Sequence, residues 1–450
     1  MTKMPNYTAT TNACKLCKPL GASIAFRGIE SCVPFLHGSQ GCATYMRRYI
    51  ISHFNEPIDI ASSSLGEKQA IYGGGINLKR GLQNVTAKYA PKIIGVATTC
   101  LTETIGDNVP MILAEYQKEN GTADAPLVVN VSTPSYAGTH MEGFNAAVRE
   151  IIEQLTIESE PNETINLLSG FISTADIRFL KDVCKDFDIA VTILPDYSDT
   201  LDGLALNDYP LIPEGGTPLA AIKTMGGAKA TIELGSTLPA KTGGTVLEQK
   251  FGTTLYQTGL PIGIRATDAL FDQLAELSGN EIPERHTAAR GRLIDSMVDG
   301  HKYIFGKRAV VYGEEDLVVG ITSFLAEIGI HTVLCASGGK SGRFESCIAE
   351  ALEGMDCELP VVKEDVDFLD IETMAKKLKV DLVIGHSKGY AFSRKENLPL
   401  IRVGFPIHDR VGGQRILHLG YHGAQALFDL ITNTVIEKKQ SDSPIGYSYM

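Results

Sequence analysis

Three cysteines in the first 100 residues have the residue type and the local context of metal ligands: Cys17, Cys42 and Cys100. Each stands in a predicted turn beside glycine or at the end of a predicted strand. Glycine lets the backbone approach a bulky inorganic group, and backbone N–H groups in such turns can point at cluster sulfides. Their separations, 25 and 58 positions, match no compact zinc or ferredoxin pattern. The fold itself must therefore assemble any site built from them.

Three thiolates leave an iron–sulfur cluster one ligand short, because a [4Fe–4S] core usually takes four. We therefore expect another subunit to complete the site. Cys14 forms a Cys-x-x-Cys pair with Cys17, which is a weak signal alone and makes Cys14 a reserve ligand. The chain has nine cysteines, an odd number, and is too large to need disulfides. We expect the remaining five to be structural: Cys32, Cys184, Cys335, Cys347 and Cys357.

Other chemical motifs are weak. The segment Gly338–Ser341 resembles the end of a phosphate loop but lacks the first glycine of that motif, and Gly73–Gly75 lacks the last glycine of a dinucleotide fingerprint. No hydrolase motif of the G-x-S-x-G or H-E-x-x-H type occurs. His37 is of interest because it shares a turn with Cys42, whereas Glu103 and Asp107 are expected to be helix-start carboxylates.

The elements that must position these residues alternate between short β-branched runs and amphipathic stretches, which predicts parallel sheets covered by helices. The predicted strands are 92–97, 127–131, 165–168, 190–194, 308–312, 331–335 and 381–384. Helical periodicity marks 141–155, 175–187 and 285–304. In such sheets ligands bind beyond the carboxyl ends of the strands, so the residues that follow the strands are the candidates for function.

The length of 450 residues is sufficient for about three domains. A polar linker at 158–163 and a boundary near 300 to 307 divide the chain into units 1–160, 161–300 and 301–450. We predict an α/β protein of three Rossmann-like, doubly wound parallel-sheet domains. The first of them carries the cluster cysteines, and the cluster site lies at the subunit interface.

Composition excludes several classes of protein. The formal net charge is −12, which argues against a general nucleic-acid surface and leaves room only for local basic patches. No apolar run is long enough to span a membrane, and the N-terminus has no apolar core of a signal peptide. We therefore expect a cytoplasmic protein with no nucleic-acid or membrane partner.

Several collinear motifs together resemble the β-type chain of the nitrogenase component 1 family. They are Cys17-Lys-Pro-Leu-Gly-Ala22, His37-Gly-Ser-Gln-Gly-Cys42, His53-Phe-Asn-Glu-Pro57, Ala97-Thr-Thr-Cys100, Thr133-Pro-Ser135, Pro213-Glu-Gly-Gly216 and Arg402-Val-Gly-Phe-Pro406. The resemblance covers nearly the whole chain. It implies that Cys17, Cys42 and Cys100 hold an iron–sulfur cluster shared with an α-type partner, either a [4Fe–4S] cluster or an [8Fe–7S] P-cluster. Ser135 matches a serine near the catalytic P-cluster.

The resemblance also implies partners. An α-type chain would join this chain in an α2β2 heterotetramer and would hold the iron–molybdenum cofactor or its precursor. A NifH-type iron protein would deliver electrons, with ATP binding left to that protein. In this family the metal cluster supplies the chemistry, and this chain would supply ligands, burial and docking surface.

Two roles in the family compete. The first is the NifN-like scaffold chain, which pairs with a NifE-like chain, receives its precursor from NifB and matures the iron–molybdenum cofactor. The short N-terminal arm and local matches favour this role; the matches are Lys15-Leu-Cys-Lys-Pro-Leu-Gly21, Arg47-Arg48, Leu274-Ala-Glu-Leu-Ser-Gly-Asn280, Leu427-Phe-Asp-Leu430 and Pro444-Ile-Gly-Tyr-Ser-Tyr449. The alternative is a NifK-like catalytic β subunit beside a NifD-like chain, in a nitrogenase or a related reductase such as methylthio-alkane reductase. The presence of all three cysteines together with Ser135 favours this alternative.

A hypothesis of a different class is a binding protein of periplasmic-receptor-like α/β architecture whose cysteines are merely buried. The two classes differ in an observable property, because a cluster protein is brown after anaerobic purification and a binding module is colourless.

Overall fold

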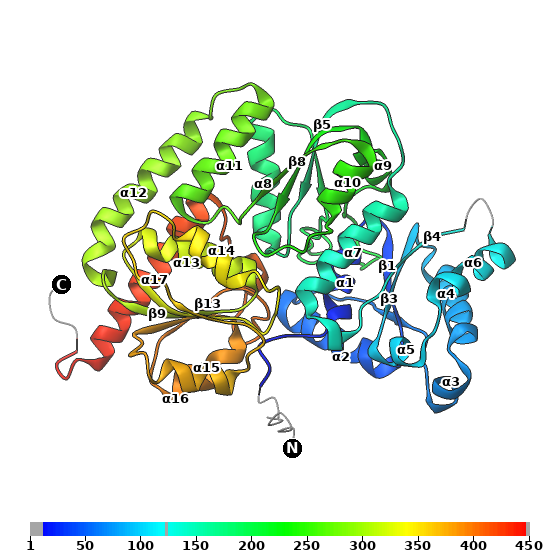
Figure 1. Ribbon diagram of the computed structural model, residues 1–450, viewed down its shortest axis with the longest axis horizontal. Helices are drawn as coiled ribbons and strands as arrows, with labels where there is room; N and C mark the ends of the chain where they lie inside the picture. Colours follow the sequence, from blue (N-terminus) through cyan, green and yellow to red (C-terminus); the bar gives the residue numbers. More distant parts are fainter. Residues whose placement is uncertain (1–11, 122–124, 447–450) are drawn as a thin grey trace, which may run out of the picture.

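The computed structural model describes residues 12–121 and 125–446 and contains three parallel β-sheets (Figure 1). The first sheet has the order β2-β1-β3-β4, with β2 Ala61–Ser62, β1 Cys32–His37, β3 Ile93–Thr98 and β4 Leu127–Val131. The second has the order β6-β5-β7-β8, with β6 Val191–Leu194, β5 Asn162–Leu168, β7 Ala228–Leu234 and β8 Thr254–Thr258. The third has the order β11-β10-β9-β12-β13, with β11 Val361–Lys363, β10 His331–Ala336, β9 Arg308–Tyr312, β12 Leu382–Gly385 and β13 Leu400–Arg402.

Helices cover the faces of these sheets, as burial of both faces of a parallel sheet requires. The helices of the first sheet are α1 Lys18–Arg27, α2 Gln40–Phe54, α3 Glu67–Tyr72, α4 Gly75–Tyr89, α5 Cys100–Ile105, α6 Val109–Asn120 and α7 His140–Leu155. Those of the second are α8 Thr174–Asp186, α9 Leu219–Thr224, α10 Gly243–Phe251 and α11 Gly263–Ser278. The remainder are α12 Glu284–Ile304, α13 Glu315–Glu327, α14 Phe344–Ala351, α15 Phe368–Ala375, α16 Tyr390–Lys395 and α17 Gly420–Asp442.

The α/β class and the three parallel sheets are confirmed. All seven predicted strands are present, with bounds that differ by at most three residues, but six strands were missed: β1, β2, β7, β8, β11 and β13. Pro34 lies inside β1, where the missing N–H disfavours a strand, yet the element is buried throughout. The predicted linker is partly wrong, because β5 already begins at Asn162. The division at 160 and 300 stays a prediction, and α12 runs through position 300.

Helices α1 and α7 pack unusually closely because glycine lies on both sides of their contact. A β-carbon on Gly21 would lie 1.7 Å from the carbonyl oxygen of His140, and one on Gly143 would lie 1.8 Å from the carbonyl oxygen of Lys18. The N–H of His140 also donates to the carbonyl of Leu16 at 3.1 Å. This contact fixes the start of α1 against the start of α7 and the loop that precedes it.

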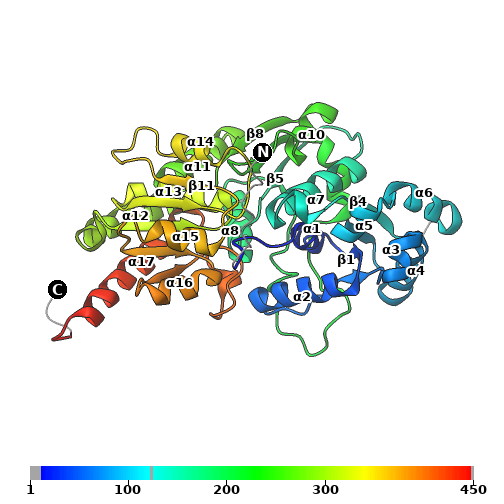
Figure 2. The same cartoon turned by 60° about the horizontal axis from the view of Figure 1, so that its bottom comes forward.

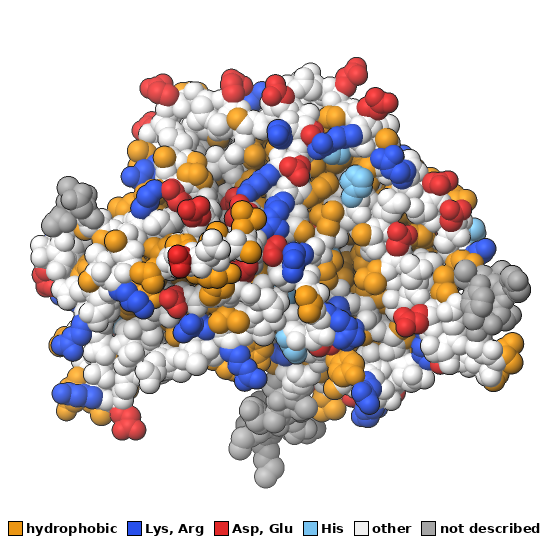
Figure 3. Space-filling model, turned by 180° about the vertical axis from the view of Figure 1, so that it is seen from behind, with side chains coloured by type: hydrophobic (Ala, Val, Ile, Leu, Met, Phe, Trp, Pro, Cys, Tyr) orange, Lys and Arg blue, Asp and Glu red, His pale blue; other side chains and the backbone are white. Residues whose placement is uncertain are grey.

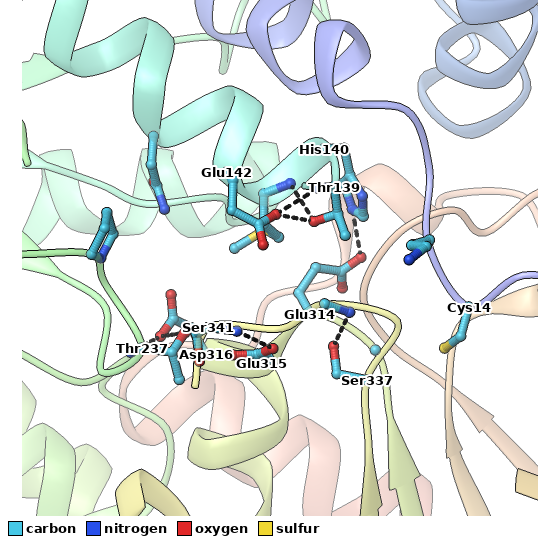
Figure 4. Close-up of a pocket in the computed structure, with 16 residues that line it drawn as sticks. Cys14, Thr139, His140, Glu142, Thr237, Glu314, Glu315, Asp316, Ser337 and Ser341 are labelled. Carbon is cyan, nitrogen blue, oxygen red and sulfur yellow. Dashed lines mark hydrogen bonds and ion pairs between the residues drawn. The ribbon is translucent and has the colours of Figure 1, made fainter. Parts of the chain in front are cut away.

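The segment before α1 crosses to the third sheet, so the three sheets meet at one junction (Figure 2). Ala13 forms an isolated bridge with Asp367, and Lys15 pairs with Asp365 at 2.6 Å. In the interior of the junction, His140 Nε2 lies 3.1 Å from Glu314 Oε1, with both side chains buried (Figure 4). The buried pair thereby links α7 to the residue that caps α13.

A second buried carboxylate joins the second sheet to the C-terminal part of the chain. Asp176 in α8 accepts from the N–H groups of His418 and Leu419 at 2.7 and 3.1 Å, and lies 3.0 Å from His418 Nδ1. Burial alone would raise the pKa of Asp176, but the charge and hydrogen bonds of His418 outweigh burial and lower it. The same balance, with His140 as the partner, lowers the pKa of Glu314.

These lowered pKa values predict acid lability of the junction. A carboxylate whose folded-state pKa is lowered stabilises the protein above its ordinary pKa, here 3.8 for Asp176, and the stabilisation is lost as the pH falls through that range. We expect Asp176→Asn to cost roughly 2 kcal/mol at neutral pH, the usual loss for a hydrogen bond to a charged group. The thermal unfolding midpoint of this variant should fall less between pH 7 and pH 3 than that of the parent chain.

The exposed Asp182 on the same helix provides a control, since Asp182→Asn should leave the pH profile unchanged. A pH profile of Asp176→Asn parallel to that of the parent would contradict the assignment.

Candidate functional site

The three candidate cysteines lie at the N-termini of three helices around the first sheet. Cys17 is the N-cap of α1, Cys42 lies in the first turn of α2, and Cys100 is the first residue of α5. Helices α2 and α5 follow the neighbouring parallel strands β1 and β3, so their N-termini meet at the same sheet edge. Pro19 suits the first turn of α1 because the N–H that proline lacks would have no partner there.

The structure brings the predicted ligands together. Cys17 interacts electrostatically with both Cys42 and Cys100. Ser135, which begins the short helix η1 (Ser135–Ala137), bridges the group: its N–H donates to Cys100 Sγ at 3.2 Å, and its hydroxyl accepts from the N–H of Lys18 at 3.2 Å. All four residues are partly exposed. The expected grouping of Cys17, Cys42, Cys100 and Ser135 is therefore present in the geometry.

Three negatively charged thiolates this close together repel one another, so the site favours them only when a cation is bound. Burial raises the pKa of the Cys17 thiol, the hydrogen bond with Ser135 lowers it, and the neighbouring Cys100 and Cys42 raise it further. Lys388 also lowers the pKa of Cys17. Helix N-termini favour negative charge, so the local backbone suits thiolates that a metal centre would neutralise.

The thiols do not form the ligand set of a single ion. Within residues 12–121 and 125–446, no three His, Cys, Asp or Glu side chains converge closely enough to hold one metal ion. This spread excludes a zinc-type site built from this chain's described residues alone. A multinuclear cluster binds each thiolate to a different iron and therefore suits separated thiols better.

Glu103 anchors the loop that carries Ser135, a role that sequence reasoning missed. The carboxylate lies in the first turn of α5, as expected, but it also accepts hydrogen bonds from the hydroxyls of Thr98 and Ser132, the latter at 2.5 Å. The Thr98 hydroxyl in turn accepts from the N–H of Thr133 at 2.8 Å. Glu103 thereby ties the segment 132–135 to the helix that begins with Cys100.

His37 supports the site rather than offering a ligand. Its ring is fully buried, with Nδ1 2.9 Å from the Ser63 hydroxyl and Nε2 3.1 Å from Asp107 Oδ2. Asp107 also accepts from the N–H of Gly74. Burial lowers the pKa of His37, and Asp107 raises it. Both ring nitrogens have partners, so His37 fixes the end of β1 close to the turn that carries Cys42.

The remaining cysteines divide as expected, with one exception. Cys32, Cys184, Cys335 and Cys347 are at most 3% exposed, as we expect of structural cysteines, and Cys357 is partly buried. The prediction that Cys14 is a reserve ligand is wrong, because the N-terminal segment places Cys14 in the core of the third sheet. Its Sγ lies 3.7 Å from His386 Nε2, and burial raises its pKa to about 12.

The segment Gly338–Ser341 lines a cavity of about 40 Å³ at the junction (Figure 4). Its backbone donors have partners in the chain's own carboxylates: the N–H of Ser341 donates to Glu315 at 3.3 Å, and that of Gly342 donates to Glu364 at 2.9 Å. Burial raises the pKa of Glu315 to about 7. These carboxylates occupy the positions from which a phosphate would accept the same bonds.

Large apolar side chains are exposed beside the cysteines and on α3 and α4. Tyr45 and Tyr136 are 47% and 68% exposed, and Ile71, Tyr72 and Ile76 are each at least 75% exposed. On the face in Figure 3, basic side chains lie between hydrophobic patches without forming one continuous basic surface. No helix in the described part of the chain is both long and apolar enough to cross a membrane.

Comparisons with known proteins agree with this geometry. The family described as "Nitrogenase component 1 type Oxidoreductase" matches residues 17–436. The nitrogenase molybdenum-iron protein beta chain of Clostridium pasteurianum is 36% identical over 95% of this chain and 93% of that protein. The beta chain of Methanococcus maripaludis is 34% identical over 96% and 95% of the two chains, respectively.

A solved structure described as "Nitrogenase Cp1 at pH 6.5" superposes with a TM-score of 0.95 at 34% identity, covering 99% of this chain and 98% of that one. The relatives above are named as molybdenum-iron protein beta chains rather than as scaffold chains. They therefore favour the catalytic alternative over the scaffold role that the local motifs suggested. The extent and collinearity of these matches show that the chain belongs to the nitrogenase component 1 family, as a β-type chain.

Proposed function

We propose that this chain is the β subunit of a catalytic nitrogenase-type reductase. In this proposal Cys17, Cys42 and Cys100 hold one half of an iron–sulfur cluster at the interface with an α-type, NifD-like partner. The single observation that carries the proposal is the grouping of three partly exposed thiols at three helix N-termini, with the Ser135 N–H directed at Cys100 Sγ. The catalytic role rather than the scaffold role is supported by the relatives' names.

The donor set suits a P-cluster-type [8Fe–7S] core. Thiolates are the usual protein ligands of such clusters, and hydrogen bonds to sulfur tune their potentials. When bound, the cluster would relay electrons from a NifH-type iron protein toward an iron–molybdenum-type cofactor held in the partner. The chain's own contribution is to place three thiolates, to direct the Ser135 N–H at one of them, and to exclude water from the buried side.

The exposed apolar side chains around the cysteines support a partner that covers the site. Large apolar side chains exposed close to one another can mark a contact with another protein. Tyr45 interacts electrostatically with Cys17, and Tyr136 directly follows Ser135, so this surface adjoins the ligands themselves. In this proposal the partner supplies the opposing thiolates across the same surface, in an α2β2 heterotetramer.

The test of the function is turnover by the complex co-purified with its α-type partner. We expect acetylene or dinitrogen reduction with a NifH-type protein and ATP, together with iron and heterometal in the preparation. An iron-containing complex that shows no such turnover but transfers a cofactor precursor would contradict the catalytic role and favour the scaffold.

Substitution of a ligand should remove the cluster. We expect Cys42→Ala in the co-purified complex to lower the iron content and to change the electron paramagnetic resonance spectrum, because a thiolate of a shared core has no equivalent replacement. Cys184→Ala is the matched control, since that thiol is buried in α8 and belongs to the core. Iron content and spectrum that stay the same in Cys42→Ala would reject the ligand assignment.

Glu103 should set the cluster's potential through the position of the Ser135 loop. We expect Glu103→Gln to retain the loop, since an amide oxygen still accepts both hydroxyls, and Glu103→Ala to release it. Loss of the N–H···S bond lowers the cluster's midpoint potential, whereas loss of a negative charge raises it. Redox titration followed by electron paramagnetic resonance should therefore place Glu103→Ala at a more negative potential than Glu103→Gln.

Glu233 provides the matched control for this experiment, because this buried carboxylate also accepts a threonine hydroxyl, that of Thr242 at 2.6 Å, but lies in the second sheet. Glu233→Ala should lower the thermal unfolding midpoint without moving the potential. Equal upward shifts in both Glu103 variants would show that the residue acts by charge alone and would refute the positioning role.

A further inference from the structure

Arg27 is a buried cation without a partner. It is the last residue of α1 and only 4% exposed, yet its guanidinium makes no hydrogen bond or ion pair with any residue that the structure describes. Fully buried arginines are rare unless paired, because an isolated charge away from water is costly. Burial lowers the pKa of Arg27 to about 10, but the side chain remains cationic at neutral pH. The guanidinium therefore has no anion from the described part of the chain in direct contact with it.

Arg27 lines a cavity of about 550 Å³. Its walls are the segment Glu56–Asp59 after α2, the residues Asp199 and Thr200, and the loop Gly203–Gly215 between β6 and α9. Figure 2 shows this loop, in green, running beside α2. The volume lies within the range of small-molecule sites, which combine apolar walls with a few placed polar groups.

Four carboxylates line the cavity: Glu214 is exposed, Asp199 lies 3.7 Å from Lys181, and Asp59 and Glu56 have other partners. Asp59 accepts from the Tyr89 hydroxyl at 2.7 Å and pairs with Arg47 at 3.4 Å. Glu56 accepts from the N–H of Gly203 at 3.0 Å. Both carboxylates attract Arg27 electrostatically, but neither contacts it. These two carboxylates thus have hydrogen-bond partners of their own, and the buried Nε of Arg27 has none in the described part of the chain.

The loop opposite Arg27 presents apolar side chains. Leu204, Leu206, Tyr209 and Leu211 are 84%, 47%, 63% and 58% exposed, respectively. Exposed apolar residues of this size at the mouth of a cavity mark a binding site. A ligand that contacts both walls would have an anionic group that binds Arg27 and an apolar part that packs against the loop.

We propose that Arg27 and the loop Gly203–Gly215 form a binding site for an organic carboxylate with an apolar body. A planar guanidinium matches the two oxygens of a carboxylate and forms paired, charge-assisted hydrogen bonds with them. The carboxylate has two possible sources with the same chemistry: a free small molecule, or an acidic side chain of a neighbouring subunit flanked by apolar residues. The site is separate from the cysteines, so it stands independently of the proposed function.

Benzoate is the probe for the test, and benzyl alcohol is its uncharged counterpart. Isothermal titration is performed on the full chain and on the co-purified complex. We expect benzoate to bind the chain, Arg27→Met to weaken that binding at least tenfold, and Arg27→Lys to weaken it less. Benzyl alcohol should bind far more weakly than benzoate. Arg80→Met, at an exposed position on α4, removes the same charge and should leave benzoate binding unchanged.

The complex distinguishes the two sources. Benzoate binding by the complex as well as by the chain supports a free ligand. Binding by the chain alone, together with dissociation of the Arg27→Met complex at lower salt than the parent complex, supports a carboxylate from a neighbouring subunit. The proposal is overturned if benzoate binds neither form, or if Arg27→Met and Arg80→Met affect binding equally.

Discussion

The contact between α1 and α7 is the constraint on which the site depends. Without side chains at Gly21 and Gly143, the two backbones approach to van der Waals distance, and no other residue type fits either position. The approach brings the start of α1, with Cys17, against the residues that precede α7, with Ser135. A parallel sheet alone would gather only the helices that follow β1 and β3. The third thiol reaches the group because two glycines allow this packing.

The same contact connects the site to the rest of the molecule. His140 is the first residue of α7, and its carbonyl oxygen lies against Gly21 of α1. Its ring pairs with Glu314, which precedes α13. The segment before Cys17 continues into the third sheet, where Cys14 contacts His386. The candidate ligands are therefore attached to a junction of all three sheets. A rigid support of this kind suits a site that must hold an inorganic group with little reorganisation between redox states.

The polar side chains around the cysteines form a chain of hydrogen bonds with one another. Glu103 holds Ser132 and Thr98, Thr98 holds Thr133, and the resulting loop aims the Ser135 N–H at Cys100. On the opposite side, Asp107 and Ser63 hold His37 at the end of β1. Arg27 differs from all of these because its charge has no partner in the described chain. The polar groups beside the cysteines therefore bind one another, whereas Arg27 is the group for which we propose an external ligand.

The sequence by itself determined the class of fold and most of the strands, and it singled out the cysteines that we propose as ligands. Buried β-branched runs and helical periodicity are local signals, and the glycine and proline around Cys17, Cys42 and Cys100 are local as well. The resemblance of collinear motifs added the family, but short local matches favoured the scaffold role because they do not bear on the site's chemistry.

Only the tertiary structure decided which groups meet. Cys14 and Cys17 are three positions apart, yet their side chains go to different sheets, because the chain crosses the junction between them. Glu103 acts on Ser132, 29 positions away, and the cavity beside Arg27 is lined by Asp199 and Thr200, more than 170 positions away. Contacts of that separation leave no periodic trace in the sequence, because packing between elements, rather than the order of residues within one element, creates them.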